Sequence, residues 1–474
     1  MEKNKINTRY VLFLSIAAAM GGLLFGYDWV VIGGAKPFYE RYFDITSSPV
    51  YQGIAMSSAL FGCIAGAAVA GVFMDKYGRK IPLLFSAFLF IFTSIGTGLF
   101  NSFSAFMLFR ILGGVGIGIA SNVSPVYIAE IAPAHMRGKL VAVNQLTIAT
   151  GVLAAQLTNM LIARPVPEGA TDALIAASWN GQAGWRWMFW ACSVPATVFF
   201  ISMFFVPESP RWLVKAGFSD KAASILKKIG GESYARNETA EIAVTVKSSE
   251  NISFNVLFSR TIMPVVLLGI FLAVFQQWCG INVIFNYAEE VFASAGYGIS
   301  STLFNIVLTG TVSLLFTVIS MFIVDRWGRK GLMLTGAGGL SLVYVVMATG
   351  YYLHIRGFFM LFTVVTAISI YTLTLAPITW VLLSEIFPNK VRGQAMSVAT
   401  LALWTACLIL TLTFPILNKT LGPSGTFGVY SAICFFGFFY MLKKLPETKG
   451  KSLEQIETEL TGSSRHRETE TSVA

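Results

Sequence analysis

Two charged residues lie deep inside apolar runs, where a charge is costly. Asp28 lies within the run from Val11 to Ala35, and Arg110 lies within the run from Ala105 to Ile128. An ionised acid at the centre of a bilayer costs roughly 2.5–3.5 kcal/mol, so such a residue is a candidate functional residue. A carboxyl that exchanges a proton beside a movable cation can link proton binding to conformation. The pair therefore indicates proton-coupled transport; the alternative is a static ion pair that joins two helices.

The elements that must position this pair are membrane helices. The chain has 474 residues, of which 55% are hydrophobic and 12% charged, and soluble domains do not have that balance. Apolar runs of about 20 residues span a bilayer, and the first run is too long for the core of a signal peptide. We expect an all-α membrane protein with twelve transmembrane helices, near residues 10–35, 50–74, 81–100, 105–128, 138–163, 186–206, 262–288, 301–324, 331–353, 358–384, 392–415 and 424–445.

These spans place Asp28 and Arg110 at a similar depth. If the first helix ends near Ala35 and the fourth begins near Ala105, the two residues lie seven and five residues from the same membrane surface. At 1.5 Å per residue, each is roughly 8–10 Å below it. Equal depth permits an ion pair between the two helices.

The basic residues predict the orientation of the chain. The net charge is +10, and 27 of the 34 Lys and Arg residues fall on the side that holds both termini, with six on the other side and Arg110 in the membrane. Cytoplasmic loops carry the excess of Lys and Arg, so we expect both termini in the cytoplasm. The positive charge is then explained by topology, and we expect a lipid bilayer and no nucleic acid as partner.

Cysteine and histidine give no sign of metal or redox chemistry. The five cysteines, at positions 63, 192, 279, 407 and 434, all lie in apolar runs and are interpreted as packing residues. The three histidines, at positions 135, 354 and 466, fall outside the middle of the helices. No metal-ligand spacing, phosphate loop or catalytic triad is found, so we expect neither an enzyme nor a cofactor.

The chain repeats itself at a long period. Three motifs recur in the same order: Asp75–Lys80 returns as Asp325–Lys330, Glu130–Pro133 with Arg137 returns as Glu385–Pro388 with Arg392, and Pro207–Arg211 is matched by Pro446–Gly450. Two parallel six-helix repeats that hold a substrate between them near the midplane are expected. The predicted divisions are an N-terminal bundle at 1–206, a cytoplasmic helical linker at 207–260, a C-terminal bundle at 261–445 and a cytoplasmic tail at 446–474.

Short helices are predicted outside the two bundles. Ser219 and Asp220 can cap a helix that runs to Ile229 and stops at Gly230-Gly231. A capping-box pattern at Ser452–Gln455 opens one more short helix near the end of the chain.

The repeated motifs resemble those of the major facilitator superfamily, and specifically of its sugar porter family. The resemblance covers about Tyr10 to Leu460 and includes Gly-Arg-Lys twice, Pro-Glu-Ser-Pro-Arg at 207–211, Gln276-Gln277 with Gly280-Ile281-Asn282, and Pro-Glu-Thr-Lys-Gly at 446–450. The chain is most similar to bacterial D-xylose–proton symporters and more distantly similar to animal glucose facilitators. The resemblance implies the major facilitator fold and a proton-coupled monosaccharide symporter, for D-xylose or a related pentose or hexose, that works by alternating access.

The resemblance also implies roles for individual residues. In the family, the positions of Asp28 and Arg110 pair and couple protons, and facilitative relatives tend to carry Asn in place of Asp28. Family sugar ligands match Gln145, Gln276, Gln277, Asn282 and Trp380, with Phe25, Tyr287 and Trp404 as weaker candidates. Amides can donate to and accept from sugar hydroxyls, and an indole offers a flat apolar face. The alternatives are amides that join helices and a tryptophan that anchors the membrane interface.

A set of charged residues on the side that holds the termini is implied to close the inner gate: Asp75, Arg79, Glu130, Arg137, Glu208, Arg211, Asp325, Arg329, Glu385 and Arg392. The alternative is that these residues only anchor the topology and form exposed ion pairs of little value.

Several positions depart from the family pattern. Ser313, Leu403 and Cys407 stand where many relatives carry amides, Val152 replaces a Gln of the xylose symporters, and Asn286 replaces a more usual Tyr. A less polar C-terminal half of the pocket would fit a different pentose, a deoxy sugar or a hexose. A proton-independent uniporter and a non-transporting sugar sensor are the alternative functions. Short outer loops and motif details suggest a bacterial inner membrane.

Overall fold

The computed structural model describes residues 6–133, 135–167, 169–248, 254–388, 391–451 and 453–461, without the side chains of 245–248, 254, 324, 325, 453, 454 and 461. Over these residues the chain is helical throughout. The α-helices are α1 (Thr8–Tyr42), α2 (Pro49–Tyr77), α3 (Lys80–Leu99), α4 (Phe103–Ile131), α5 (Arg137–Ile162), α6 (Asp172–Ala177), α7 (Trp185–Ala191), α8 (Ser193–Phe205), α9 (Pro210–Lys215), α10 (Ser219–Ser248), α11 (Met263–Trp278), α12 (Ile281–Asn286), α13 (Ala288–Ser294), α14 (Ile299–Trp327), α15 (Arg329–Tyr352), α16 (Phe358–Leu373), α17 (Leu375–Ile386), α18 (Arg392–Lys444) and α19 (Leu453–Thr461). A π-helical turn at Asn180–Gly184 and a 3₁₀ turn at Phe254–Phe258 complete the order.

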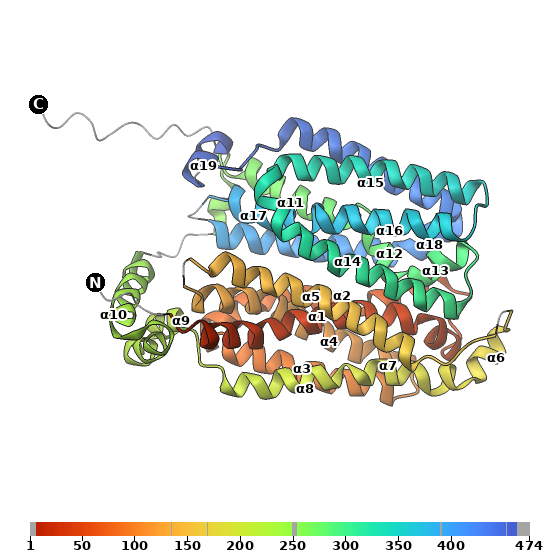
Figure 1. The fold of residues 1–474 in the computed structure, drawn as a ribbon, viewed down its shortest axis with the longest axis horizontal. Coiled ribbons are helices and arrows are strands. Elements are labelled where there is room, and N and C mark those ends of the chain that lie inside the picture. The colour runs from red at the N-terminus through yellow and green to blue at the C-terminus, as the bar shows by residue number, and fades with distance from the viewer. Residues whose placement is uncertain are drawn as a thin grey trace, which may run out of the picture.

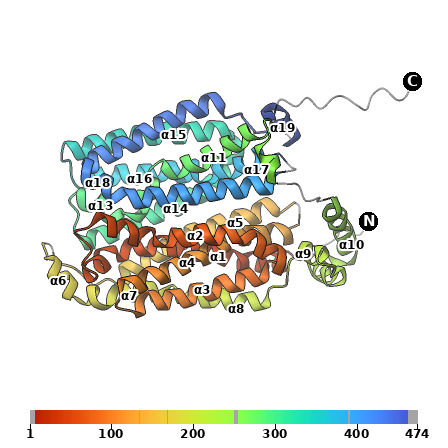
Figure 2. The same cartoon turned by 180° about the vertical axis from the view of Figure 1, so that it is seen from behind.

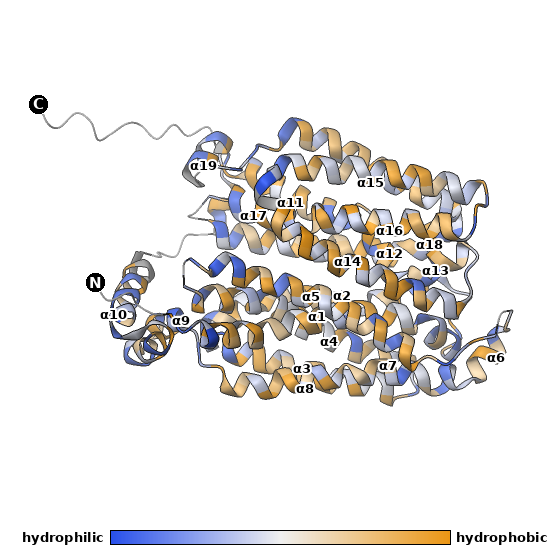
Figure 3. Cartoon of the chain, viewed as in Figure 1, coloured by the Kyte–Doolittle hydropathy of each residue, from blue (hydrophilic) through white to orange (hydrophobic). Residues whose placement is uncertain are grey.

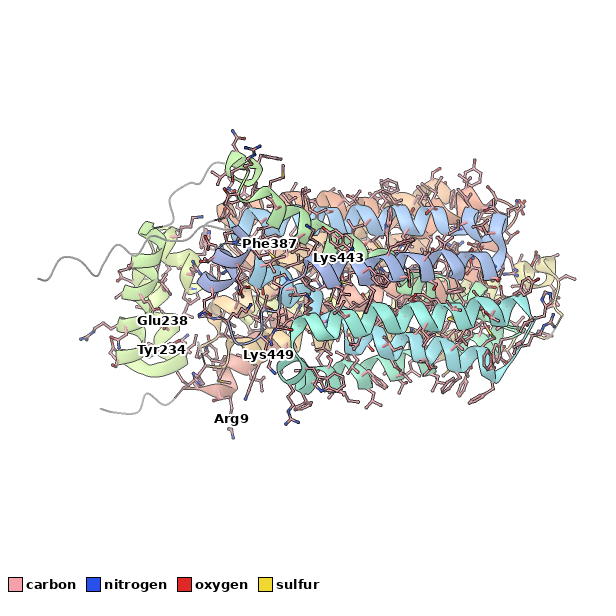
Figure 4. All side chains as sticks on the ribbon, turned by 90° about the horizontal axis from the view of Figure 1, so that it is seen from above. Arg9, Tyr234, Glu238, Phe387, Lys443 and Lys449 are labelled. Atoms are coloured by element: carbon pink, nitrogen blue, oxygen red, sulfur yellow. The ribbon has the colours of Figure 1, made fainter. Side chains whose placement is uncertain are left out.

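The described residues contain twelve membrane crossings. Eleven helical stretches are long and apolar enough to cross a bilayer, and α18 has 53 residues, which at 1.5 Å each gives about 80 Å against a hydrocarbon core of about 30 Å. The backbone of α18 leaves the helical region at Gly422, where φ is 67°. Phe387, just before α18, and Lys443, near its end, lie at the same end of the molecule in Figure 4, so α18 crosses twice.

The helices form two bundles that lie side by side. Figures 1 and 2 show α1–α5, α7 and α8 in one bundle and α11–α18 in the other. This is the expected all-α fold of two six-helix halves. The start of α1, together with α9, α10 and α19, lies at one end, which we call the terminal end; α6 and α13 lie at the opposite, distal end. The exact boundaries predicted for the four divisions stay a prediction.

Hydropathy follows this architecture. Figure 3 shows hydrophobic residues along the length of both bundles and hydrophilic residues gathered at the two ends and on α10. The labelled residues at the terminal end in Figure 4 include Arg9, Tyr234, Glu238 and Lys449. A bundle that is apolar along its sides and polar at its ends is that of a multi-pass membrane protein.

Glycines bring the helices of the first half close together. A Cβ atom at Gly26 of α1 would lie 2.0 Å from the Ile148 carbonyl oxygen of α5, and one at Gly62 of α2 would lie 1.8 Å from the Ile111 carbonyl oxygen of α4. Small residues at such crossings let backbones approach, which is how membrane helices pack without a hydrophobic driving force. These contacts hold α1, which carries Asp28, against α5, and α4, which carries Arg110, against α2.

The first helix is longer than expected. The prediction that it ends near Ala35 is wrong, because α1 continues to Tyr42. The extension contains Lys36, Glu40 and Arg41, whose charges would end an apolar run. In the structure Lys36 and Arg41 are each paired with acids, so the helix continues without isolated charges.

The segment between the halves folds outside the bundle. Helix α10 begins at Ser219 as expected, and its backbone breaks at Gly231, where φ is 83° and ψ is −178°. Helix α19 begins at Leu453. Ser452, part of the predicted capping box, and the tail from residue 462 onward lie outside the described residues.

Candidate functional site

Asp28 and Arg110 form a buried ion pair within the first half. The Nη1 atom of Arg110 donates a hydrogen bond of 2.8 Å to Oδ1 of Asp28, and both side chains are almost fully buried. The guanidinium also lies over the Phe189 ring, 5.5 Å from its centroid. Asp28 Oδ2 and Arg110 Nε are buried without a hydrogen-bond partner. One carboxylate oxygen of Asp28 is thus paired with the guanidinium, and the other accepts no hydrogen bond.

A small cavity adjoins this pair. It has a volume of about 10 Å³, close to what one water molecule needs. Asp28 and Arg110 line it from the first half, and Asn286 of α12 lines it from the second. The side-chain oxygen of Asn286 is also buried without a partner. The cavity therefore places the acid beside a polar group of the opposite half.

A break in the seventh span positions three buried amides. Helix α11 ends at Trp278 and α12 begins at Ile281, because Gly280 adopts φ 85° between them. Asn282 then donates to Oε1 of Gln277, whose own amide nitrogen donates to Oε1 of Gln276 at 3.3 Å. The amide of Gln276 donates to the Ala376 carbonyl oxygen at 3.3 Å. The three predicted ligands form one hydrogen-bonded chain of side chains.

The tenth span is also broken, next to Trp380. Thr374 has φ −120° and ψ −83°, and it separates α16 from α17. The Gln276 amide donates to backbone carbonyls that follow this break. The Trp380 side chain is 37% exposed, so it is free to present its face to a ligand or to lipid. Gln145 of α5 is half-buried.

The aromatic candidates divide into two groups. Phe25 and Trp404 meet across the two halves, with ring centroids 5.7 Å apart, and Trp29 joins them at 6.0 Å from Trp404. The indole nitrogen of Trp404 is buried without a partner. Tyr287 is fully buried, and its hydroxyl donates to the Thr411 carbonyl oxygen at 2.6 Å. Tyr287 is therefore held as a packing residue in this conformation, whereas Trp404 keeps a free donor.

Three of the positions that depart from the family pattern are buried in the second half. Cys407 is fully buried and lies 3.9 Å from the Asn282 amide nitrogen, and Leu403 and Ser313 are buried as well. The side chain of α18 next to the Asn282 amide is thus a thiol.

The charged residues at the terminal end of the first half form a compact network. Arg79 Nη2 donates to Glu130 Oε1 at 2.7 Å, and Glu130 Oε2 accepts from the Ser209 hydroxyl at 2.5 Å. The Glu208 carboxylate accepts from the backbone amides of Arg79, Lys80 and Ser209. Burial raises the pKa of Glu208, and these amide hydrogen bonds oppose that rise.

The second half repeats this arrangement. Arg329 Nη2 donates to Glu385 Oε1 at 3.2 Å, and Glu447 accepts from the backbone amides of Arg329 and Lys330. Burial acts to raise the pKa of Glu447, but the amide hydrogen bonds outweigh it and hold the pKa below its ordinary value. Gly328 adopts φ 84°, and a Cβ atom there would lie 2.7 Å from Glu447 Oε2.

The remaining predicted gate residues lie apart from these networks. Asp75 pairs with Lys215 at 2.8 Å in an exposed ion pair, and Arg137 and Arg211 are exposed. Arg392 donates to the Phe387 carbonyl oxygen at 3.3 Å. The side chain of Asp325 lies outside the described residues. The ion pairs Arg79–Glu130 and Arg329–Glu385 each stay within one half.

Contacts between the halves gather from mid-depth to the distal end. A Cβ atom at Gly53 of α2 would lie 2.5 Å from the Leu412 carbonyl oxygen of α18, and one at Gly33 of α1 would lie 3.0 Å from the Asn286 carbonyl oxygen. Beyond the distal ends of the spans, the Val166 amide donates to the Ser300 hydroxyl at 3.1 Å. The bundle is closed at its distal end.

The sequence reasoning missed a second charged cluster, at this distal end. Lys36 of α1 forms ion pairs with Glu40, Glu289 and Glu290. The signal in the sequence is a Lys and a Glu four residues apart just after one apolar run and two adjacent Glu just after another. Nothing in one sequence shows that runs 250 residues apart bring these charges together.

Comparisons with known proteins agree over nearly the whole chain. Residues 14–460 match the family model described as "Sugar (and other) transporter". The D-xylose-proton symporter of Escherichia coli strain K12 is 35% identical, over 95% of this chain and 96% of the relative. The glucose transport protein of Synechocystis sp. is 37% identical, over 96% and 98%. The structure of the xylose transporter of Escherichia coli in its inward open conformation is 34% identical, with a TM-score of 0.83 over 95% of this chain and 100% of that one.

These matches bear out the resemblance seen in the motifs, and they assign the chain to a group of transporters. With the family model covering almost every described span and relatives above 30% identity along almost the full length, the chain belongs to the sugar transporter family.

Proposed function

We propose that this chain is a proton-coupled monosaccharide symporter that works by alternating access. The observation that carries the proposal is the buried Asp28–Arg110 pair, at 2.8 Å. The name of the Escherichia coli relative, a D-xylose-proton symporter, supports both the coupling ion and the class of substrate.

The coupling follows from the electrostatics of Asp28. Desolvation favours the protonated carboxyl, and a close guanidinium favours the ionised one. If sugar binding or rocking of the halves changes the distance to Arg110, the proton affinity of Asp28 changes with conformation, and the reverse coupling must be equal. A proton that crosses 100 mV releases about 2.3 kcal/mol. At 1.4 kcal/mol per decade this supports roughly a 50-fold sugar gradient.

The sugar is proposed to bind between the halves at mid-depth. The buried, hydrogen-bonded amides of Gln276, Gln277 and Asn282 offer donors and acceptors to the sugar hydroxyls. Gln145 and Trp380 are the other proposed sugar ligands. Phe25 and Trp404, whose rings meet across the two halves, would cover the apolar face of the sugar ring. The indole nitrogen of Trp404 has no hydrogen-bond partner and could donate to a sugar hydroxyl. The Tyr287 hydroxyl already donates to a backbone carbonyl, which favours a packing role for Tyr287 over contact with the sugar.

The identity of the sugar is proposed only as a pentose or a hexose. One relative is named for D-xylose and another for glucose. Cys407, Leu403 and Ser313 make the second half less polar than an amide set would, which favours a sugar with fewer hydroxyl contacts on that side.

The gate and the orientation belong to the same proposal. The excess of basic residues at the terminal end supports a cytoplasmic location for both termini, in a cell membrane and, by the bacterial relatives, a bacterial inner membrane. The distal end is then the outer side, and the conformation faces inward. The charged networks around Arg79–Glu130 and Arg329–Glu385 would join across the halves when the carrier opens outward.

Uptake into proteoliposomes tests the proposal. With an imposed inward proton gradient, xylose, arabinose or glucose should accumulate above its external concentration. Asp28→Asn should abolish accumulation yet retain exchange of sugar for sugar, because exchange does not require net proton movement. Asp172→Asn, at an exposed acid paired with Arg41, is the matched control and should behave as the parent.

Two outcomes would contradict symport. Equal uptake with and without the gradient would make the chain a uniporter and reduce Asp28 to a structural acid. Sugar binding without uptake or exchange would identify a sensor.

A further inference from the structure

A buried lysine joins the two halves at the distal end. Lys36 of α1 is 2% exposed and lies 3.0 Å from Glu40, one turn further along α1. Its ammonium also pairs directly with Glu290 of α13 and lies 3.8 Å from Glu289. Glu40 belongs to the first half, and Glu289 and Glu290 belong to the second. We call these four residues the outer cluster.

The outer cluster has more acids than bases. Three carboxyls face one ammonium, so full ionisation would leave two negative charges uncompensated. The nearby Arg41 is engaged by Asp172 at 2.7 Å, and Arg110 by Asp28.

The other neighbours of the outer cluster are neutral. Gln52 of α2 donates to Glu40 Oε2 at 3.3 Å. The Tyr39 hydroxyl is buried without a partner, and Lys36 lies 5.9 Å from the centroid of the Tyr287 ring. Arg41 also acts on Glu40 through its charge, but it is paired with Asp172 and, among the described residues, does not donate a hydrogen bond to the cluster's carboxylates.

Two carboxylate oxygens of the cluster receive no donor. Glu40 Oε1 and Glu290 Oε2 are buried and accept no hydrogen bond. An ionised carboxylate oxygen in that position loses its hydration and gains no hydrogen bond in exchange. Burial of a protonated, neutral carboxyl costs much less free energy. Burial raises the pKa of Glu290, Lys36 opposes the rise, and the neighbouring charges of Glu289 and Glu40 add to it.

The cluster lies where the halves must separate for the distal end to open. Gly33, less than one turn before Lys36, is packed against the Asn286 carbonyl of the second half. Any rocking that parts α1 from α12 and α13 must also part Lys36 from Glu289 and Glu290. The excess carboxyls would then be hydrated and could ionise independently.

We propose that the outer cluster is a second proton-linked element of the transport cycle, which holds the outer gate shut while one of its carboxyls is protonated and releases it when that carboxyl ionises. The inference rests on the proposed orientation and on alternating access, but not on Asp28 as the coupling acid. It assigns Lys36, Glu40 and Glu290 a gating role in addition to the Asp28–Arg110 pair.

The direction of the pH effect follows from linkage. The carboxyl holds its proton more tightly in the closed gate than in the hydrated, open gate. Stabilisation of the closed gate is therefore complete below the pKa of the open state and is lost as pH rises through the raised pKa of the closed state. An acidic exterior favours closure, and an alkaline one favours opening.

The test measures the distance across the outer gate as a function of pH. Spin labels at Val50→Cys on α2 and Lys419→Cys on α18 report on the two halves, since both positions are exposed and the five native cysteines are buried. All variants carry Asp28→Asn, so that titration of Asp28 does not contribute. Between pH 5 and pH 8 the population with a long distance should rise severalfold.

Neutral variants decide the outcome. Glu290→Gln should hold the gate shut and remove the pH response, and Glu40→Gln should at least halve it. Lys36→Met should open the gate at every pH, whereas Asp172→Asn, at the same end but within one half, should respond as the parent. An unchanged pH response in a folded Glu290→Gln or Glu40→Gln protein would overturn the proposal. The same proteins can be assayed for sugar exchange, so that failure of the gate and failure of transport are told apart.

Discussion

At Asp28 and Asn282 the two halves place different polar groups at corresponding positions of the repeat. Gly26-Tyr27-Asp28 aligns with Gly280-Ile281-Asn282, 254 residues later. Asp28 carries a carboxyl, which is paired with a guanidinium inside its own half. Asn282 carries an amide, which does not ionise, and this amide donates to Oε1 of Gln277. In the proposed symporter, the first half would use this position for a proton, and the second half would use it for a hydrogen-bonded ligand.

The proposed roles of the amides can be separated from helix packing. Asn282→Ala and Gln277→Ala should each weaken sugar binding about 2- to 12-fold, the equivalent of one hydrogen bond worth about 0.5–1.5 kcal/mol. Asn159 is the matched amide, since it is buried and donates to the Val31 carbonyl at 3.0 Å. Asn159→Ala should lower thermal stability and leave affinity unchanged. Calorimetric titration with sugar measures the difference; equal losses at all three sites would make the amides structural.

At the scale of elements, the spans could be predicted and their breaks could not. Every predicted apolar run is largely helical, because a backbone in lipid must satisfy its own hydrogen bonds, but the runs 262–288 and 358–384 are each divided into two helices. The end of α1 could not be predicted, since it depends on Glu289 and Glu290 pairing with Lys36. Equal depth permitted the Asp28–Arg110 pair, and the pair forms even though α1 ends seven residues later than assumed.

The break at Gly280 is an element that the site requires. With φ at 85°, an L-residue pays about 1–2 kcal/mol, and a Cβ atom there would lie 2.6 Å from Cγ of Tyr430. Gly280→Ala should therefore lower the melting temperature and weaken sugar binding, because Asn282 would be turned away from Gln277. Gly428→Ala, in α18 with open space around it, should be neutral or slightly stabilising. Fluorescence-monitored melting in detergent compares the two; a neutral Gly280→Ala would show that the break is not needed.

At the scale of the whole molecule, the two halves meet where α2 packs on α18, α5 on α14, and α1 on α12 and α13, and alternating access requires the contacts at the distal end to break and re-form in each cycle. Each half is held by close glycine crossings such as Gly26–Ile148 and Gly62–Ile111. Between the halves, the contacts at the distal end are a mixture of backbone packing and the charges of Lys36 and its acids. The charges can respond to protons and the packing cannot, so proton binding can shift the balance of conformations without deforming either half.

The packing contact at Gly53 gives a direct test of this division. Because a Cβ atom at Gly53 would lie 2.5 Å from the Leu412 carbonyl oxygen, Gly53→Phe cannot be accommodated unless α2 and α18 separate at the distal end. We expect the variant to populate the outward-facing conformation at every pH, seen as a long distance between the labels on Val50→Cys and Lys419→Cys, and to lose net transport. Gly71→Phe, on the same helix where nothing lies within 4 Å, should keep the parent distance. A short distance in Gly53→Phe would mean that the halves yield locally, and that rigid-body rocking does not describe this carrier.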